Sequence, residues 1–186
     1  KTGGLEELHN AVSGTINEIV KELVFEHNLG LNDVNCIVCA GNTTMIHLLL
    51  NLDPAHIRKE PYVPTANFLP VLRAAQAQIN INPRGLLSCV PGVSGYVGGD
   101  TTAGVLSSGL YQEETPCILI DIGTNGEIVL GSKEFLVACA ASAGPAFEGS
   151  GVTSGMRAGG GAIQKVRVDK KDFSVQYSVI QDRKPK

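Results

Sequence analysis

The chain has 186 residues, of which 43% are hydrophobic and 18% are charged, so it can bury a sizeable core and is not expected to be disordered. Its formal net charge of −3 gives no electrostatic case for a nucleic-acid partner. No apolar run approaches the roughly 20 residues of a membrane span, and no charged-then-apolar leader opens the chain. We therefore expect a cytoplasmic protein that does not enter a membrane. Because the sequence lacks a starting Met and leads at once into a helix, we also expect a piece of a longer protein.

The cysteines bear on compartment and metal binding. Their number is odd, and most of them lie in apolar, strand-like runs, which predicts reduced and buried thiols. They are Cys36, Cys39, Cys89, Cys117 and Cys139. Cys36 and Cys39 have the spacing of half a metal clip, but residues three apart on a strand point to opposite faces, and no second pair follows at zinc spacing. A metal or redox role for this pair is the weaker interpretation.

The first predicted element is a helix over residues 5–28, because its apolar residues recur at three- and four-residue steps. Gly30 can take the left-handed conformation that ends such a helix. His9 and His27 lie near the two ends of the helix, and we interpret them as surface residues rather than ligands.

A strand-to-helix junction follows. Residues 34–40 predict a buried strand that runs into a helix over 45–50, which Asn42 or Thr43 can cap through a side-chain oxygen. Such junctions often carry sites in α/β proteins. His47 lies within the apolar helix, where a satisfied core or interface histidine is favoured over a catalytic one.

The next segment is rich in proline over 53–70 and predicts an irregular surface connection. A short helix or helical turn over 71–79 and a strand over 86–90 come after it. A glycine cluster over 91–100 then ends in Asp100, which is placed to cap a helix over 101–110. Asp100 has two interpretations: a simple cap, or a carboxylate that faces a cleft and is kept ionised by the helix N-terminus.

The most informative stretch reads as strand, polar turn, strand over residues 117–131. Asn125-Gly126 is the strongest signal for a two-residue hairpin turn. Asp121 ends the first strand, and a carboxylate there can hold Mg²⁺ directly or through water. The small residues beside it expose backbone N–H groups that can hold a phosphate. These residues are Gly123, Thr124, Asn125 and Gly126, followed by Glu127. Taken alone, the stretch is equally consistent with an ordinary hairpin.

The remaining chain predicts a third strand of the same antiparallel set over 135–140 and two alternating strands over 163–168 and 173–180. Between them lies a third glycine cluster. Pro145 fits the first turn of a short helix there, with Gly144 and Glu148 as candidate nucleotide contacts. Arg157 is either a surface residue or a phosphate contact, and the sequence favours neither.

Several of these motifs, in this order, resemble the large C-terminal domain of the reductive activators of corrinoid proteins. They are Gly41-Asn-Thr-Thr-Met-Ile-His47, Glu60-Pro-Tyr-Val-Pro64, Pro91-Gly-Val-Ser-Gly-Tyr-Val-Gly-Gly-Asp100, Asp121-Ile-Gly-Thr-Asn-Gly-Glu127, Gly144-Pro-Ala-Phe-Glu-Gly149 and Gly155-Met-Arg-Ala158. The resemblance covers nearly the whole chain. It implies an α/β, ribonuclease H-like fold shared with acetate and sugar kinases, Hsp70 and actin, in which ATP lies between two similar halves.

The resemblance also implies how the chain is divided. Residues 1–111 would be the end of the first half and residues 112–186 the start of the second, with the polar break at 112–116 as the boundary. Asp121 to Glu127 would be the second of two phosphate loops. The first loop, a C-terminal part of the nucleotide site and an iron–sulfur module are expected outside this chain.

The implied activity is ATP-driven reduction of cob(II)alamin to cob(I)alamin in a corrinoid protein, with Mg²⁺ as cofactor and an electron donor as a second partner. Asp121 would organise Mg²⁺, and Asp100 would orient the attacking water. Two rivals stay open: a small-molecule kinase of the same fold, with Asp100 as base, and a non-catalytic platform that docks a corrinoid protein. A homodimer is also left open.

Overall fold

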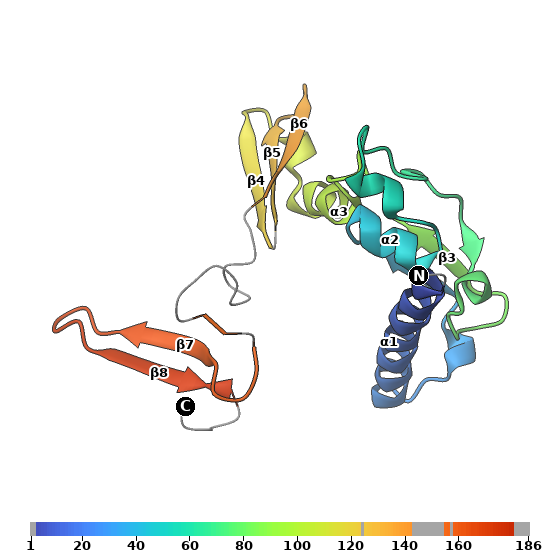
Figure 1. Cartoon of the computed structure of the whole chain (residues 1–186), viewed down its shortest axis with the longest axis horizontal. Helices are drawn as coiled ribbons and strands as arrows, with labels where there is room; N and C mark the ends of the chain where they lie inside the picture. The colour runs from blue at the N-terminus through green and yellow to red at the C-terminus, as the bar shows by residue number, and fades with distance from the viewer. Residues whose placement is uncertain (1–2, 124, 143–154, 157, 181–186) are drawn as a thin grey trace. The chain divides into compact units, whose positions relative to one another are not determined.

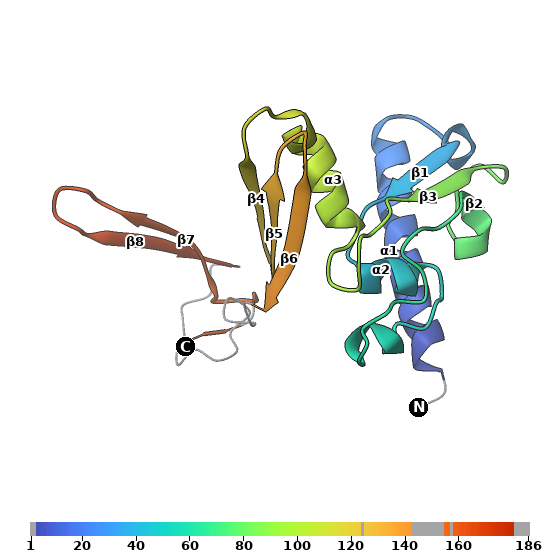
Figure 2. The same cartoon turned by 90° about the horizontal axis from the view of Figure 1, so that it is seen from above.

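The computed structural model describes residues 3–123, 125–142, 155–156 and 158–180. The chain divides into two compact units, Lys1–Asp121 with Glu127–Ala140 and Ile122–Gly126 with Ala141–Lys186. Figures 1 and 2 show the elements of each unit. No helix in the described part of the chain has both the length and the apolar character needed to cross a membrane.

Helix α1 (Gly4–Glu26) confirms the first predicted helix. Its end differs from the prediction, because Asn28 adopts φ 55°, whereas Gly30 has φ −105°. Asn tolerates the left-handed region better than most residues, and Leu29 N–H donates to the Val24 carbonyl at 2.8 Å once Asn28 has turned the chain. The helix is followed by a single 3₁₀ turn, η1 (Leu31–Asp33).

The first sheet has the strand order β1-β3-β2. Strand β1 (Cys36–Cys39) and strand β3 (Leu86–Cys89) are parallel, with Cys39 opposite Cys89. Strand β2 (Leu72–Arg73) adds to β3 in the antiparallel direction. The predicted strands at 34–40 and 86–90 are confirmed, but β1 is not buried on both faces, since Val38 is 66% exposed.

Helices α1 and α2 (Thr43–Leu49) cover one face of this sheet. Val12, Ile16 and Val20 of α1 pack against a core that includes Leu49 of α2 and Leu87 of β3. Alternation along the strands explains this arrangement, because Ile37 and Cys39 on β1 share the face of Leu87 and Cys89 on β3.

Two histidines are buried beside these helices, and one of them, His9, joins α1 to α2. His47 is fully buried: its Nδ1 lies 2.7 Å from the Thr43 carbonyl, and its Nε2 accepts a hydrogen bond from Ala66 N–H at 3.4 Å. The prediction of a satisfied core histidine is confirmed. His9 was expected at the surface, and that prediction is wrong. It is buried, with Nδ1 3.1 Å from the Leu48 carbonyl, because α1 lies directly on α2.

The stretch from 50 to 81 connects α2 to β3. It contains η2 (Ala55–Arg58), β2 and η3 (Ala74–Ala77). The expected irregular connection is found over 53–70, interrupted only by η2. The expected helical turn over 71–79 is half wrong, because Leu72 and Arg73 pair with Leu87 and Leu86 of β3 before the chain turns into η3. A free strand edge on β3 thus outweighed the local helical pattern.

Helix α3 (Gly99–Ser108) and η4 (Leu110–Gln112) lead to the second sheet, of order β4-β5-β6. Its strands are β4 (Cys117–Ile122), β5 (Asn125–Gly131) and β6 (Leu136–Ser142), which confirms the three predicted strands. Figures 1 and 2 both show α3 beside this sheet. A Cβ on Gly104 of α3 would lie 3.3 Å from Leu119 Cδ2 on β4, so the helix and the strand touch.

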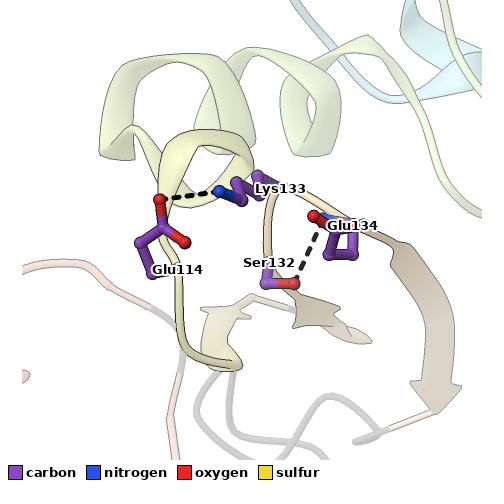
Figure 3. A network of polar contacts seen from close by, with 4 residues as sticks. All are labelled: Glu114, Ser132, Lys133 and Glu134. Carbon is purple, nitrogen blue, oxygen red and sulfur yellow. Dashed lines mark hydrogen bonds and ion pairs between the residues drawn. The ribbon is translucent and has the colours of Figure 1, made fainter.

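The turn between β5 and β6 is tied to the segment that follows η4 (Figure 3). Lys133 N–H donates to the Glu113 carbonyl at 2.9 Å, and Lys133 Nζ lies 2.7 Å from Glu114 Oε1. Within the turn, Glu134 N–H donates to Ser132 Oγ at 3.2 Å. These bonds fix the sheet to the end of the α3 segment.

The second unit contains β7 (Ile163–Val168) and β8 (Val175–Val179), an antiparallel hairpin that confirms the last two predicted strands. Apolar residues pair across it, as in Val166 with Tyr177 and Val168 with Val175. Asp169 Oδ1 accepts from Lys171 N–H at 2.7 Å and shapes its turn.

Candidate functional site

Two strand-to-helix junctions meet at the carboxyl ends of the parallel strands β1 and β3. After β1 the chain passes through Gly41 and Asn42 into α2, and after β3 it passes through the glycine cluster into α3. Val90 N–H donates to the Cys39 carbonyl at 2.9 Å, so the two segments leave the sheet side by side. In open α/β sheets, ligands bind at this edge.

The glycines of this junction are required by close backbone packing. A Cβ on Gly98 would lie 2.6 Å from Asn42 Cα, and a Cβ on Gly99 would lie 2.2 Å from the Val90 carbonyl oxygen. Asp100 N–H donates to the Gly41 carbonyl at 3.3 Å. The start of α3 is therefore held directly against the start of α2.

Asn42 confirms its predicted capping role, since its Oδ1 accepts from Met45 N–H at 2.8 Å. The sequence did not predict that Gly98 also packs against the backbone of Asn42. The hydroxyl of Thr43 donates to the Ser94 carbonyl at 2.8 Å and holds the glycine cluster from the same side. Both junctions share one pattern in the sequence, a strand followed by glycine and a capping residue. This shared pattern was the signal that could have predicted their contact.

The prediction that Asp100 caps α3 is wrong. The N-cap is Gly98, with no side-chain cap, and Asp100 lies in the first turn, where its Oδ1 accepts from Thr101 N–H at 2.8 Å. A carboxylate in the first turn of a helix interacts favourably with the helix dipole. The adjacent Thr101 was not singled out from the sequence. Its Oγ is buried and has no hydrogen-bond partner among the described residues.

Asp121 and Glu127 lie on neighbouring strands of the second sheet. Alternation places Asp121 on the face of Leu119, which contacts α3, and Glu127 on the face of the buried Val129. Burial raises the pKa of Glu127, and the charges of Asp121 and then Asp100 raise it further. Asp121 and Glu127 of one motif and Asp100 of another are thus close enough to interact, at the end of the sheet that faces the start of α3.

The turn itself is displaced from its predicted position. Asn125 and Gly126 belong to strand β5 and are not the central residues of the turn. Gly123 N–H donates to the Asn125 carbonyl at 2.9 Å across the connection. Thr124, Gly144, Glu148 and Arg157, which the sequence proposed as phosphate or nucleotide contacts, lie outside the described residues, as does the predicted short helix at Pro145.

The thiols do not form a site. All five cysteines are free, and only Cys89 is buried, so the prediction of buried thiols fails for the exposed Cys36 and Cys139. Burial raises the pKa of Cys89 to about 11, with a contribution from Cys39 opposite it. Among the residues that the structure describes, no three His, Cys, Asp or Glu side chains are arranged to bind one metal ion directly.

Comparison with known proteins identifies the family of this chain. Residues 1–113 match the model of the RACo middle region, and residues 115–186 match the model of the C-terminal domain of RACo, the ASKHA domain. A solved structure, "Reductive activator for corrinoid, iron-sulfur protein", is 49% identical, with a TM-score of 0.81 over 96% of this chain and 28% of that chain.

Two curated relatives agree. "Corrinoid activation enzyme RamQ" of Eubacterium limosum is 35% identical over 95% of this chain and 29% of its own length. "[Co(II) methylated amine-specific corrinoid protein] reductase" of Methanosarcina barkeri is 26% identical over 82% of this chain and 30% of its own length. The chain thus spans less than a third of these relatives. It belongs to the RACo family, the reductive activators of corrinoid proteins, and has the actin-like fold of that family's ASKHA domain.

Proposed function

We propose that this chain is part of the nucleotide-binding region of an iron–sulfur protein that uses ATP to drive reduction of cob(II)alamin to cob(I)alamin in a corrinoid protein. The observation that carries the proposal is the grouping of Asp100, Asp121 and Glu127 beside the start of α3, expressed in the raised pKa of Glu127. Family membership supports the corrinoid protein as the partner.

The carboxyl groups suit a magnesium nucleotide. The charges of Asp121 and Asp100 act unfavourably on the charged form of Glu127, and a divalent cation beside these groups would relieve that repulsion. Asp121 would hold Mg²⁺ through water. The bound ion would neutralise charge on the phosphates.

The other residues would position the reactants. The backbone at Gly123, Thr124, Asn125 and Gly126, which follows Asp121 in the chain, would hold phosphate oxygens, with Gly144 and Glu148 as further nucleotide contacts. Asp100, fixed by the packing of Gly98 on Asn42, would orient the attacking water. Phosphoryl transfer depends mainly on such positioning and on charge stabilisation.

The division of the chain remains part of the proposal. A boundary at residues 112–116 between the two halves of the fold is supported by the two family models, which meet between residues 113 and 115. The iron–sulfur cluster would lie in a module outside residues 1–186. An electron donor and a homodimer complete the proposed assembly.

The test is ATP hydrolysis by the full-length protein. Asp121→Ala and Asp100→Asn should each lower turnover by about a hundredfold, since each removes a group that positions Mg²⁺ or water. Glu18→Gln, an exposed carboxylate on α1, is the matched control and should leave turnover unchanged. Wild-type turnover in Asp121→Ala or Asp100→Asn would remove that residue from the site.

A second measurement separates this function from the rival kinase and docking readings. The proposed activator should reduce cob(II)alamin in a corrinoid protein only when ATP is present, recorded by the change in corrinoid absorbance. Phosphorylation of a small molecule, or binding of the corrinoid protein without any ATP dependence, would contradict the proposal.

A further inference from the structure

A groove unrelated to the carboxylate site lies in the first unit between the start of α1, helix α2 and the segment η2. Its volume is about 680 Å³, within the range of about 300–1,000 Å³ that is usual for ligand sites. Its floor is apolar and buried, with Leu48 9% exposed and Ile57 5% exposed. Its walls are the half-exposed Leu8 of α1 and Tyr96 of the glycine cluster.

The side chains that form the walls are held in place by contacts that do not involve the carboxylate site. The ring of Tyr96 pairs with that of Tyr62 at a centroid distance of 5.9 Å. A Cβ on the adjacent Gly95 would lie 2.8 Å from the Tyr62 carbonyl oxygen. On the other side, the bond between His9 Nδ1 and the Leu48 carbonyl fixes α1 on α2. The groove is therefore formed before any occupant arrives, which lowers the entropic cost of binding.

The charged residues that line the groove are two cations and one carboxylate, so cations are in excess. Arg58 and Lys59 line the groove, and neither forms an ion pair within the described part of the chain. The acidic residue of the lining, Asp53, already accepts a hydrogen bond from Ala55 N–H at 2.9 Å. An apolar floor below two unpaired cations complements an occupant that presents apolar side chains next to carboxylates.

The apolar surface continues beyond the groove through the exposed Tyr62 and Val63. A small ligand would leave this extension uncovered, whereas a protein segment would cover both the groove and its margin. We propose that this groove docks an acidic, apolar segment of the corrinoid protein, in which Leu8 and Tyr96 contact the apolar side chains and Arg58 and Lys59 pair with the carboxylates. This inference rests on the proposed function for the identity of the partner.

The test measures affinity of the full-length protein for the Co(II) form of the corrinoid protein from the same organism, by calorimetry. Leu8→Asp should weaken binding at least about tenfold, because it places a charge on the apolar wall. The double variant Arg58→Glu with Lys59→Glu should weaken binding and flatten its dependence on salt. Thermal unfolding verifies that both variants of the full-length protein fold.

The controls lie on the same helix. Leu23→Asp is matched to Leu8→Asp, since both leucines are 51% exposed, and it should bind as the wild type does. Lys21→Glu is the control for charge reversal. Basal ATP hydrolysis should be unchanged in all variants, because none of these residues belongs to the carboxylate site.

The groove proposal is overturned if wild type and both groove variants bind the corrinoid protein equally while the wild type remains an active ATP-dependent activator. If Leu8→Asp abolished self-association but left binding of the corrinoid protein intact, the groove would be a contact between two copies of this protein. That result would also overturn the proposal. If the wild type neither hydrolyses ATP nor binds the corrinoid protein, the proposed function fails together with the groove.

Discussion

At the scale of single residues, the carboxyl groups carry most of the chemical information. Asp121 and Glu127 come from one motif and Asp100 from another, and each alone has an ordinary explanation as a cap, a hairpin tip or a strand residue. The fold adds the effect of the Asp121 and Asp100 charges on Glu127. It is recorded in the raised pKa of Glu127, the group that burial also disfavours as an anion.

Glu127 should make stability depend on pH. Its pKa is higher in the folded state than in the unfolded chain, so its favourable contribution is present at pH values below the unfolded pKa of about 4.3 and is lost as pH rises through the folded pKa. Glu127→Gln should therefore be more stable than the wild type at pH 7, with a smaller difference at pH 4. Urea unfolding at both pH values measures this, and an equal midpoint at pH 7 would contradict it.

The cysteines give a second prediction at this scale. With its pKa raised to about 11, Cys89 is about a thousandth thiolate at pH 8, and its burial also keeps reagents away. Exposed Cys36 should thus be alkylated by iodoacetamide far sooner than buried Cys89. Peptide mass spectrometry over a time course checks the order, and equal rates in the folded protein would refute the burial of Cys89.

At the scale of elements, the start of α3 is the critical packing point. It is the place where two strand-to-helix junctions approach so closely that only glycine fits. Gly98 and Gly99 therefore matter for their missing Cβ and not for flexibility, because Gly98 has an ordinary extended conformation at φ −87°.

Gly98→Ala or Gly99→Ala should destabilise the protein by about 2 kcal/mol or more, since each new Cβ meets backbone that cannot move without shifting a strand or a helix. Gly14→Ala is the matched control. Gly14 lies inside α1 with open space around its Cβ position, so alanine there should stabilise by up to about 1 kcal/mol. Denaturant midpoints compare the three, and a neutral Gly99→Ala would rule out the close packing on Val90.

At the scale of the whole molecule, the two sheets have different roles. The parallel pair β1 and β3 presents its carboxyl ends to the junctions, and the second sheet brings Asp121 and Glu127 to the same place. The groove beside α1 is built from the first unit alone, in a part of the molecule that the carboxylates do not occupy. The proposed nucleotide site and the proposed docking surface can thus be tested independently with variants of the same protein.

The sequence by itself determined the strands and helices, because periodic apolar residues and glycine or proline boundaries are local signals. It also determined the family, through motifs such as Asp121-Ile-Gly-Thr-Asn-Gly-Glu127. Its predictions were wrong in local details that depend on neighbouring elements. Strand β2 pairs with the edge of β3, Gly98 and not Asp100 is the N-cap of α3, and Asn125-Gly126 belongs to strand β5.

Only the tertiary structure decided which side chains meet. His9 is buried because α2 lies over it, and Leu8, next to it in the chain, faces a groove instead. Asp100 and Glu127 interact across a helix and a sheet that are separate in the sequence. Burial and electrostatic coupling arise from distances between elements, and no local pattern of residues encodes those distances.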